Sequence, residues 1–380
     1  MRVAFHAPLK HPDHPVPSGD RRMARLLISA IEAGGHHVEV ASELRTFDGS
    51  GEARVQTRIR DAAVAESERL IEYYRGRPAV ERPSIWFTYH VYYKAPDWLG
   101  PAVSAALDIP YATAEASYAS KREGGPWALN HEQTRVALQS AAVHFCVTEF
   151  DRTGLEALLG GSDRLIYLPP FIDEVPAMEG QARAGYREQL CSVARFDPAT
   201  PILVCVAMMR PGDKETSYRM LAAALAGIAD LDWNLVLVGD GAARPAVEKA
   251  FAAVCPERIH WAGELAPEEV GRHLAAADLY VWPAHNEAYG MAFLEAQARG
   301  LPVVAQATRG VPDVVAAGRS AVLTPEGDLA AFGQAIRGMI VDGTRRAAMG
   351  EAARAFVAGE RTIERAAAIL DGGLTRAVGR

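Results

Sequence analysis

Short apolar runs alternate with stretches of helical periodicity along the whole 380-residue chain. Several runs are continuously apolar and rich in β-branched or aromatic residues, which is typical of strands buried on both faces of a parallel sheet. In the first half, the predicted strands are 2–6, 37–41, 85–90, 109–114, 142–147 and 164–168. In the second half, they are 202–207, 234–239, 258–262, 278–282, 302–306 and 321–324. The pattern therefore predicts six buried strands in each half.

Helical periodicity lies between the predicted strands. The apolar stripe of residues 19–34 consists of Met23, Leu26, Leu27, Ala30 and Ile31. The stripe of residues 214–229 consists of Tyr218, Leu221, Ala222, Leu225 and Ile228. Strands that alternate with helices are typical of right-handed βαβ units in open, doubly wound sheets. We therefore expect an α/β protein with two Rossmann-like, doubly wound parallel-sheet domains.

The predicted boundary between the two domains is a linker at about 172–185. Two prolines precede this stretch, and no strand is predicted after it until Ile202. We expect a first domain over 1–175 and a second over 185–355. The Ala- and Arg-rich stretch 344–377 is helical in pattern, and a C-terminal helix at about 360–380 could pack back on the first domain.

Composition excludes some classes of function. The net charge of −7 argues against a general nucleic-acid binder, although it leaves a local basic patch open. No stretch has the roughly 18 apolar residues of a membrane span, and no signal peptide is recognisable. We therefore expect a cytoplasmic protein, and contact with the inner face of a membrane stays open.

The cysteines are scattered along the chain without a C-x-x-C pair. They are Cys146, Cys191, Cys205 and Cys255. Reduced cysteines that fill the core are favoured over a disulfide framework or a zinc site. We expect no metal ligands in this sequence.

The stretch HNEAYGMAFLEAQARG, residues 285–300, carries two glutamates in a largely apolar setting. Glu287 falls in the loop after the predicted strand 278–282, and Glu295 falls in the second turn of a helix that ends before Gly300. An ionised carboxylate only accepts hydrogen bonds, so ligand hydroxyl groups would satisfy it. A capping glutamate with a structural salt bridge is the alternative.

The N-terminus of this predicted helix is a natural anion site. Backbone amides around Gly290, Met291 and Ala292 would have no partner within the helix. In open α/β folds, ligands bind at the carboxyl ends of the strands. The segment therefore predicts a site for a hydroxyl-rich ligand that carries phosphate.

Two further loops of the second half point to the same edge. Arg210 and Lys214 follow the strand 202–207, and two cations there suit a pyrophosphate, with a solvated basic turn as the alternative. Gly239, Asp240 and Gly241 follow the next strand, but Arg244 breaks the G-x-G-x-x-G pattern, so a dinucleotide fingerprint is weak.

In this order, the segments resemble glycosyltransferase family 4, whose members are retaining, nucleotide-sugar-dependent enzymes with the GT-B fold. NEAYGMAFLEAQARGLPVVA resembles the E-x7-E segment of that family, with Glu287 and Glu295 at the glutamate positions. The resemblance covers about 195–340. A weaker one covers PSGDRRMARLLISAIEAGGHHVEVAS near the N-terminus.

The resemblance implies roles for individual residues. Glu295 would hold the nucleotide ribose, Glu287 a hydroxyl group of the donor sugar, and Arg210 with Lys214 the diphosphate. The implied donor-binding residues are Gly19, Arg210, Lys214, Gly239, Gly263, Glu264, Leu265, Glu287, Tyr289, Gly290, Met291 and Glu295. The implied catalytic residues are Glu287, Arg210, Lys214 and His90. No metal or cofactor is expected beyond the nucleotide sugar itself, because the two cations would replace a divalent ion.

The sequence departs from the family at two places. Arg210 and Lys214 are four positions apart, whereas five is the common spacing in the family. The segment TAEASYAS stands where many members carry a histidine after the fourth strand. The candidates for the acceptor side are therefore His90, Glu115, Ser117 and Lys121.

The expected reaction is retaining transfer of a hexosyl unit from a nucleoside diphosphate sugar. A UDP-sugar is the first candidate and a GDP-sugar the second; the acceptor is a sugar, a lipid-linked sugar or a small molecule. No side chain is an obvious nucleophile, so departure of the diphosphate from the face that the acceptor attacks is favoured over double displacement through Glu287. The alternatives are a nucleotide-sugar epimerase or sugar phosphorylase on the same fold, and a non-enzymatic, two-lobe sugar-binding protein. Oligomeric state stays open.

Overall fold

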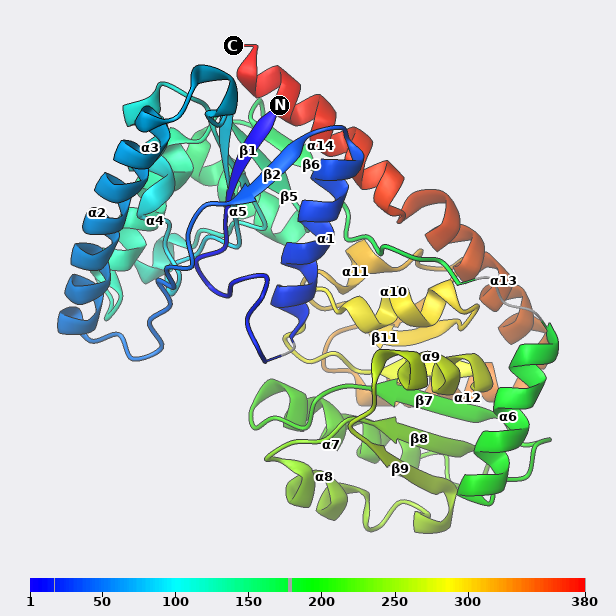
Figure 1. The fold of residues 1–380 in the computed structure, drawn as a ribbon. Coiled ribbons are helices and arrows are strands. Elements are labelled where there is room, and N and C mark those ends of the chain that lie inside the picture. Colours follow the sequence, from blue (N-terminus) through cyan, green and yellow to red (C-terminus); the bar gives the residue numbers. More distant parts are fainter. Residues whose placement is uncertain (17, 177–179, 380) are drawn as a thin grey trace. The chain divides into compact units, whose positions relative to one another are not determined.

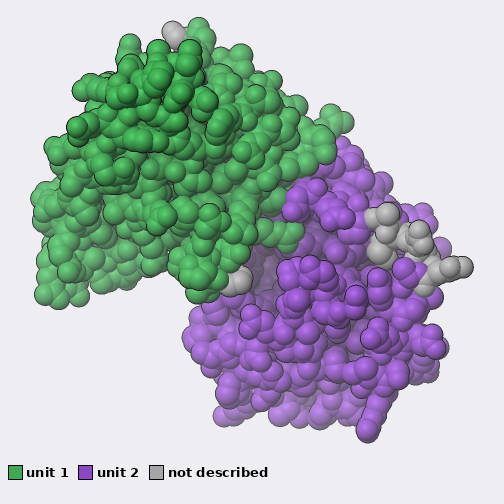
Figure 2. Space-filling view, viewed as in Figure 1, with its two compact units in different colours: residues 1–171, 363–380 green, residues 172–362 purple. Residues whose placement is uncertain are grey.

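The computed structural model describes residues 1–16, 18–176 and 180–379, and it contains two parallel six-stranded sheets (Figure 1). Unit 1 consists of Met1–Phe171 and Ile363–Arg380, and unit 2 consists of Ile172–Thr362 (Figure 2). Residues 177–179 of the predicted linker and the last residue of the predicted C-terminal helix lie outside the described residues. The expected α/β class with two doubly wound sheets is confirmed.

The sheet of unit 1 has the strand order β2-β1-β3-β4-β5-β6. Its strands are β1 (Arg2–His6), β2 (His37–Val40), β3 (Ile85–Tyr89), β4 (Tyr111–Ala114), β5 (Val143–Cys146) and β6 (Leu165–Tyr167). Neighbouring strands are parallel throughout, so their carboxyl ends share one edge. The buried rings of Phe5, Phe87 and Phe145 follow one another across the sheet, with centroids 5.6 and 5.9 Å apart.

Two helical layers cover this sheet. The helices of unit 1 are α1 (Gly19–Ala33), α2 (Ala53–Gly76), α3 (Leu99–Leu107), α4 (Ala128–Ser140), α5 (Glu149–Leu159) and α14 (Ile363–Val378). Helices α1 and α14 pack together, and α2, α3 and α4 pack with one another. Three short 3-10 helices occur in the chain, η1 (Ala79–Glu81) and η2 (Ser120–Arg122) in unit 1 and η3 (Pro256–Arg258) in unit 2, among the described residues. The predicted apolar stripe of 19–34 is fully buried in α1.

Helix α14 is fixed on unit 1 by small residues and by one contact between a carboxylate and a histidine. The backbone of Gly373 lies so close to the rings and chains of Phe145 and Ile166 that a Cβ would overlap them. At the other end of the contact, Asp371 pairs with His36, at 3.1 Å between Oδ1 and Nε2. The last helix is thus an integral layer of unit 1, although most of that unit precedes residue 172.

The sheet of unit 2 has the order β12-β11-β10-β7-β8-β9 and is also parallel. Its strands are β7 (Ile202–Val206), β8 (Asn234–Val238), β9 (Ile259–Gly263), β10 (Leu279–Trp282), β11 (Val303–Gln306) and β12 (Ala321–Thr324). The helices are α6 (Gly180–Ala194), α7 (Asp213–Ala226), α8 (Arg244–Phe251), α9 (Pro267–Ala276), α10 (Met291–Ala298), α11 (Val311–Val314), α12 (Leu329–Val341) and α13 (Gly343–Glu360). All twelve predicted strands are confirmed.

The reversal of strand order beside β7 matters for function. β7 pairs with β8 on one side and with β10 on the other, so the chain switches direction along the sheet at this strand. In doubly wound sheets, a ligand crevice forms at the carboxyl ends of the strands at such a point. The loops after β7 and β10 are those that carry the predicted donor residues.

Candidate functional site

The loop after β10 reaches α10 through a series of left-handed residues. Ala284, Asn286 and Gly290 have φ values of 64°, 54° and 84°. The amide of Glu287 donates to the carbonyl of Ala284 at 3.0 Å and closes a tight turn. Left-handed backbone at non-glycine residues is uncommon and clusters at functional sites. This turn fixes where the Glu287 carboxylate lies.

Glu287 forms an ion pair with Lys214, which lies 73 positions earlier in the first turn of α7. Trp282 Nε1 also donates to the Glu287 carboxylate at 3.3 Å, and Lys214 Nζ lies 5.5 Å from the centre of the Trp282 ring. The side chains of Lys214 and Glu287 are only 22% and 15% exposed. Each of these two partly buried charges is therefore stabilised by the other.

Arg210 lies on the same edge but is arranged differently. Its backbone carbonyl accepts the amide of Glu215 at 3.1 Å, which draws the loop after β7 into the start of α7. Its side chain is exposed, and among the described residues no carboxylate forms an ion pair with it. Arg210 therefore offers a guanidinium group whose charge is not neutralised.

Helix α10 begins at Met291, slightly later than the start at about Tyr289 or Gly290 that the sequence predicts. Gly290 caps it, and a Cβ at this residue would lie 2.8 Å from the Phe293 ring. Among the described residues, no backbone carbonyl accepts the amide protons of Gly290, Met291 or Ala292. Free amides at a helix N-terminus favour an anion.

Glu295 lies in the second turn of α10 and is half-buried rather than enclosed. Its neighbours Leu294 and Ala296 are fully buried, which anchors the helix beneath it. Tyr289 is buried as well, so its side chain belongs to the core and its backbone belongs to the loop.

The glycines after β8 are required by a close approach of two loops. Gly239 and Gly241 have φ values of 137° and 148°, and a Cβ at either position would overlap the carbonyl of Ala207 or Met209. The amide of Met209 donates to the carbonyl of Asp240 at 2.8 Å. These glycines therefore let the loops after β7 and β8 lie side by side.

The end of β9 completes this part of the edge. The amide of Gly239 donates to the carbonyl of Gly263 at 2.7 Å, so the two glycines are neighbours. Glu264 is exposed and Leu265 half-buried after the left-handed Gly263, whose φ is 73°. The structure thus places the predicted donor residues of the second half along one edge of the unit 2 sheet.

Unit 1 has its own polar cluster at the carboxyl edge of its sheet. His90 follows β3, and its Nδ1 lies 3.2 Å from Asp20 and 3.5 Å from Glu115. Glu115 follows β4, is buried, and accepts the Tyr89 hydroxyl at 3.0 Å. Both His90 and Glu115 have positive φ values, 64° and 51°. Asp20, in the first turn of α1, is a member that sequence reasoning missed.

Charge balance in this cluster favours an imidazolium. Burial by itself would lower the pKa of His90, but the carboxylates of Glu115 and Asp20 outweigh burial and raise this pKa to about 9. Burial would raise the pKa of Asp20, but the contact with His90 leaves it below its usual value. At neutral pH the cluster therefore holds one cation between two carboxylates.

The remaining candidates of unit 1 lie around this cluster. The amide of Ser117 donates to the carbonyl of Val91 at 3.0 Å, and Lys121 is exposed on η2. Gly19 is the first residue of α1, after the capping Ser18, and no atom lies within 4 Å of the position that a Cβ would take. An open backbone position directly before Asp20 would admit a ligand atom.

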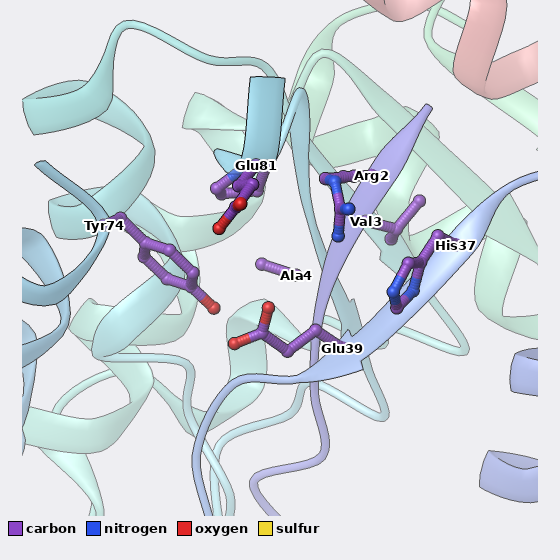
Figure 3. A pocket seen from close by; sticks show the side chains of 8 residues that line it. Arg2, Val3, Ala4, His37, Glu39, Tyr74 and Glu81 are labelled. Carbon is purple, nitrogen blue, oxygen red and sulfur yellow. The ribbon is translucent and has the colours of Figure 1, made fainter. Parts of the chain in front are cut away.

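Two hollows lie elsewhere on unit 1. One, of about 10 Å³, is lined by Arg2, Val3, Ala4, His37, Glu39, Tyr74, Glu81 and Pro83. Figure 3 shows the Tyr74 hydroxyl and the Glu39 carboxylate turned toward this small space, which holds at most one water molecule. The other is an open groove of about 450 Å³ over α2, α3 and α4. Neither contains the predicted site residues.

Residues 200–342 match the family model described as glycosyl transferases group 1. The chain is 29% identical over 219 residues to a GDP-mannose-dependent alpha-(1-6)-phosphatidylinositol monomannoside mannosyltransferase of Mycolicibacterium smegmatis, covering 55% of each chain. It is 28% identical over 252 residues to a 2-deoxystreptamine glucosyltransferase of Streptomyces kanamyceticus, covering 65% of this chain and 63% of the relative. The chain thus spans a little over half the length of these curated relatives.

Solved structures resemble the whole chain. Anabaena Alr3699/HepE in complex with UDP has a TM-score of 0.75 at 15% identity, covering 99% of this chain and 100% of that one. WaaG, a glycosyltransferase involved in lipopolysaccharide biosynthesis, has a TM-score of 0.67 at 20% identity, covering 97% and 100%. At these identities the likeness establishes the fold, which is GT-B.

Proposed function

We propose that this protein is a retaining glycosyltransferase that moves a hexosyl unit from a nucleoside diphosphate sugar to a hydroxyl group of an acceptor. One observation carries the proposal. Lys214 and Glu287 pair at the switch point of the unit 2 sheet, on the loops that also hold Arg210 and the free amides of α10. The same residues fall within the segment that matches the group 1 family model.

The roles on the donor side follow from charge and position. Arg210 and Lys214 would bind the diphosphate, together with the amides at the α10 N-terminus. Glu287 would accept a hydroxyl group of the donor sugar, and Glu295, one turn into α10, would accept the ribose hydroxyls. Binding of the donor would replace the Lys214–Glu287 ion pair by contacts to phosphate and sugar.

The chemical step conserves atoms and charge. The bond between the anomeric carbon and the diphosphate oxygen breaks, and a bond from the same carbon to the acceptor oxygen forms on the same face. The acceptor proton passes to the departing diphosphate oxygen. Arg210 and Lys214 would stabilise the charge that develops on that group.

Two cations that bind the diphosphate would make a divalent ion unnecessary in this proposal. Turnover should therefore persist in excess EDTA, with product formation measured by chromatography. Abolished turnover that returns with added Mg²⁺ would contradict this part of the proposal.

The relatives differ in the nucleotide base of the donor. Among solved structures of the same fold, Alr3699/HepE was obtained with UDP, whereas the mycobacterial relative is named for its use of GDP-mannose. We keep a UDP-sugar as the first candidate and a GDP-sugar as the alternative. The backbone after Gly263, next to Gly239, is the proposed contact for the base.

The acceptor side is proposed to be the cluster of Asp20, His90 and Glu115. Carboxylates held by a central imidazolium can accept hydroxyl groups of an acceptor without being protonated themselves. Ser117 and Lys121, on the following loop, would contact the acceptor farther from the cluster.

A panel of nucleotides tests the function directly. UDP, GDP, ADP and their hexose conjugates are added to the full chain, and the melting temperature is measured. We expect one diphosphate to raise it by several degrees, since binding to the folded state stabilises it. Release of that diphosphate together with a glycoside of retained anomeric configuration, detected by NMR, would exclude an epimerase and a phosphorylase. If no nucleotide raises the melting temperature, the proposal fails.

A further inference from the structure

Two loops of unit 1 gather aromatic and basic side chains. Tyr92, Tyr93 and Lys94 belong to the loop after β3, and Arg122 and Trp127 belong to the segment that precedes α4. Lys94 Nζ lies 5.0 Å from the centre of the Trp127 ring and 5.8 Å from that of Tyr93. The Arg122 guanidinium lies 5.0 Å from the centre of the Tyr93 ring. We call these five residues the cation–aromatic row.

The cations of this row are positioned without being neutralised. Elsewhere in unit 1, arginines form ion pairs with carboxylates, as Arg69 does with Glu66 and Arg135 with Glu132. Over the described part of the chain, neither Lys94 nor Arg122 has a carboxylate within 4.0 Å, although Glu123 is adjacent in sequence. An aromatic ring attracts a cation but leaves its net charge intact. The row therefore keeps two charges available to an anion.

The rings of Tyr93 and Trp127 contact the cations. Lys94 and Arg122 lie against Trp127 and Tyr93, and the two rings themselves meet edge to face at 5.5 Å. A platform for an uncharged sugar needs a free ring face instead. This arrangement favours a ligand with a negative group over a neutral one.

The row is held in place by the loop around Asp48. The amide of Asp48 donates to the carbonyl of Lys94 at 2.7 Å, and Trp127 Nε1 donates to the carbonyl of Asp48 at 2.9 Å. The Asp48 carboxylate is occupied by its own loop, where it accepts from Ser50 and Gly51. One buried residue thus sets the spacing between Lys94 and Trp127 without neutralising Lys94.

The row continues into the polar cluster of the same unit. The Tyr92 ring lies 5.1 Å from the His90 ring and 5.6 Å from that of Tyr93. His90 in turn contacts Asp20 and Glu115. Hydrogen-bond acceptors for hydroxyl groups and cations for an oxyanion therefore follow one another along one edge of the unit 1 sheet.

We propose that the acceptor is a hydroxyl-rich molecule bearing a phosphate or carboxylate group, which Lys94 and Arg122 bind while Glu115 and Asp20 accept its hydroxyl groups. This inference rests on the proposed function for the identity of the ligand as an acceptor. The anion itself is inferred from the charges of the row, independently of that function. A sugar phosphate, a uronate and a phosphate-linked lipid sugar all supply this chemistry.

Binding of three matched sugars to the full chain tests the inference. Glucose, glucose 6-phosphate and glucuronate share one polyol body and differ in the charged group; inorganic phosphate is the fourth probe. Dissociation constants are measured by calorimetry with UDP or GDP present, according to which one raises the melting temperature. We expect at least one anionic sugar to bind about tenfold more tightly than glucose, and the difference to shrink as salt is raised.

Variants test whether the cation–aromatic row causes the preference for an anionic sugar over glucose. Lys94→Gln combined with Arg122→Gln should abolish the difference between anionic sugar and glucose. Arg60→Gln, which changes an exposed arginine of α2 paired with Asp61, should leave it unchanged. Tighter binding of glucose 6-phosphate alone would point to a phosphate, and of glucuronate alone to a carboxylate.

The outcomes separate this inference from the proposed function. If a nucleotide still raises the melting temperature but both anionic sugars bind no better than glucose, or not at all, the inference is wrong and the function stands. If the anionic preference depends on Lys94 and Arg122 but no nucleotide binds, the anion site stands and the function fails. A preference that survives the double variant also overturns the inference.

Discussion

The pairing of Lys214 with Glu287 can be seen only in the folded chain. In the sequence, each belongs to a different loop, and each has a structural explanation of its own. The structure joins them in one ion pair beside Trp282, at the point where the strand order of unit 2 reverses. Asp20, in contrast, is not predicted as a site residue, because nothing in its local sequence indicates one. Only the fold shows that α1 places it beside His90.

The two glutamates of residues 285–300, Glu287 and Glu295, should differ in what they do. Glu295→Ala should weaken nucleotide binding by roughly tenfold or more, since a ribose hydroxyl would lose its acceptor. Glu287→Ala should chiefly lower kcat, because in the proposed function this carboxylate would contact the transferred sugar. Binding is measured by calorimetry and kcat from product formation.

Glu257→Ala, at an exposed residue of η3, is the matched control and should change neither quantity. Equal, negligible effects of the Glu287 and Glu295 variants would contradict the assignment of both residues.

The raised pKa of His90 predicts a pH dependence of stability. A histidine whose pKa rises from 6.5 to about 9 on folding contributes fully at pH values below 6.5. That contribution is lost as the pH rises from 6.5 through 9. Urea unfolding at pH 6 and at pH 9.5 should show a loss of about 3 kcal/mol in the free energy of unfolding, which is missing in His90→Gln. The same pH dependence in both proteins would show that another group is responsible.

At the scale of elements, the hydrophobic pattern predicts the strands and helices whose buried faces are largely apolar. Several of the twelve strands are continuous apolar runs, and α1 and α7 have clear apolar stripes, so sequence alone locates them. The pattern did not single out α2, the longest described helix, because its buried face includes the polar Gln56 and Ser67. Those side chains are satisfied by distant or backbone partners, Pro126 and Ala63, which only the fold reveals.

The same limit applies to the candidate site. The donor segment could be located because its residues lie within short motifs at strand ends. The cluster of Asp20, His90 and Glu115 could not, because its members come from α1 and from the residues that follow β3 and β4, which only the fold brings together. The sequence predicts His90 and Glu115 as separate candidates, and the structure shows that their side chains are in contact.

Two adjacent glycines of α14 provide a matched test of its packing. Gly373→Ala should lower the free energy of unfolding by about 1–3 kcal/mol, because the new Cβ would overlap Phe145 and Ile166. Gly372→Ala should be neutral or stabilising by up to about 1 kcal/mol, because no atom lies within 4 Å of its Cβ position and alanine favours the helix. Chemical denaturation measures both. Similar effects of the two changes would show that α14 is not packed as described.

At the scale of the whole molecule, the chain passes between the units twice, near residues 171 and 362. The two passages are hydrogen-bonded to each other, since the amide of Ile172 donates to the carbonyl of Arg361 at 3.0 Å. None of the described helices combines the length and apolar character that crossing a bilayer requires. Because the chain leaves unit 1 near residue 171 and returns to it near residue 362, unit 1 is discontinuous in sequence, whereas unit 2 is one uninterrupted stretch.

Removal of α14 should affect the units unequally. In a chain shortened to residues 1–362, hydrogen exchange measured by mass spectrometry should accelerate in α1 and β5, which α14 covers. Exchange in β7, β8 and β10 of unit 2 should stay close to that of the full chain. Unchanged protection of α1 and β5 would contradict the role given to α14.

The position of α14 also has a consequence for synthesis on the ribosome. Residues 172–362 are all synthesised before α14, so every residue of unit 2 has been made before unit 1 is complete. Unit 1 emerges first but must wait for residues 363–378, and until then the apolar surface around Phe145 and Ile166 is open to water. The earlier-made half of the protein is thus the later one to mature, and it is the half that nascent-chain chaperones would need to protect.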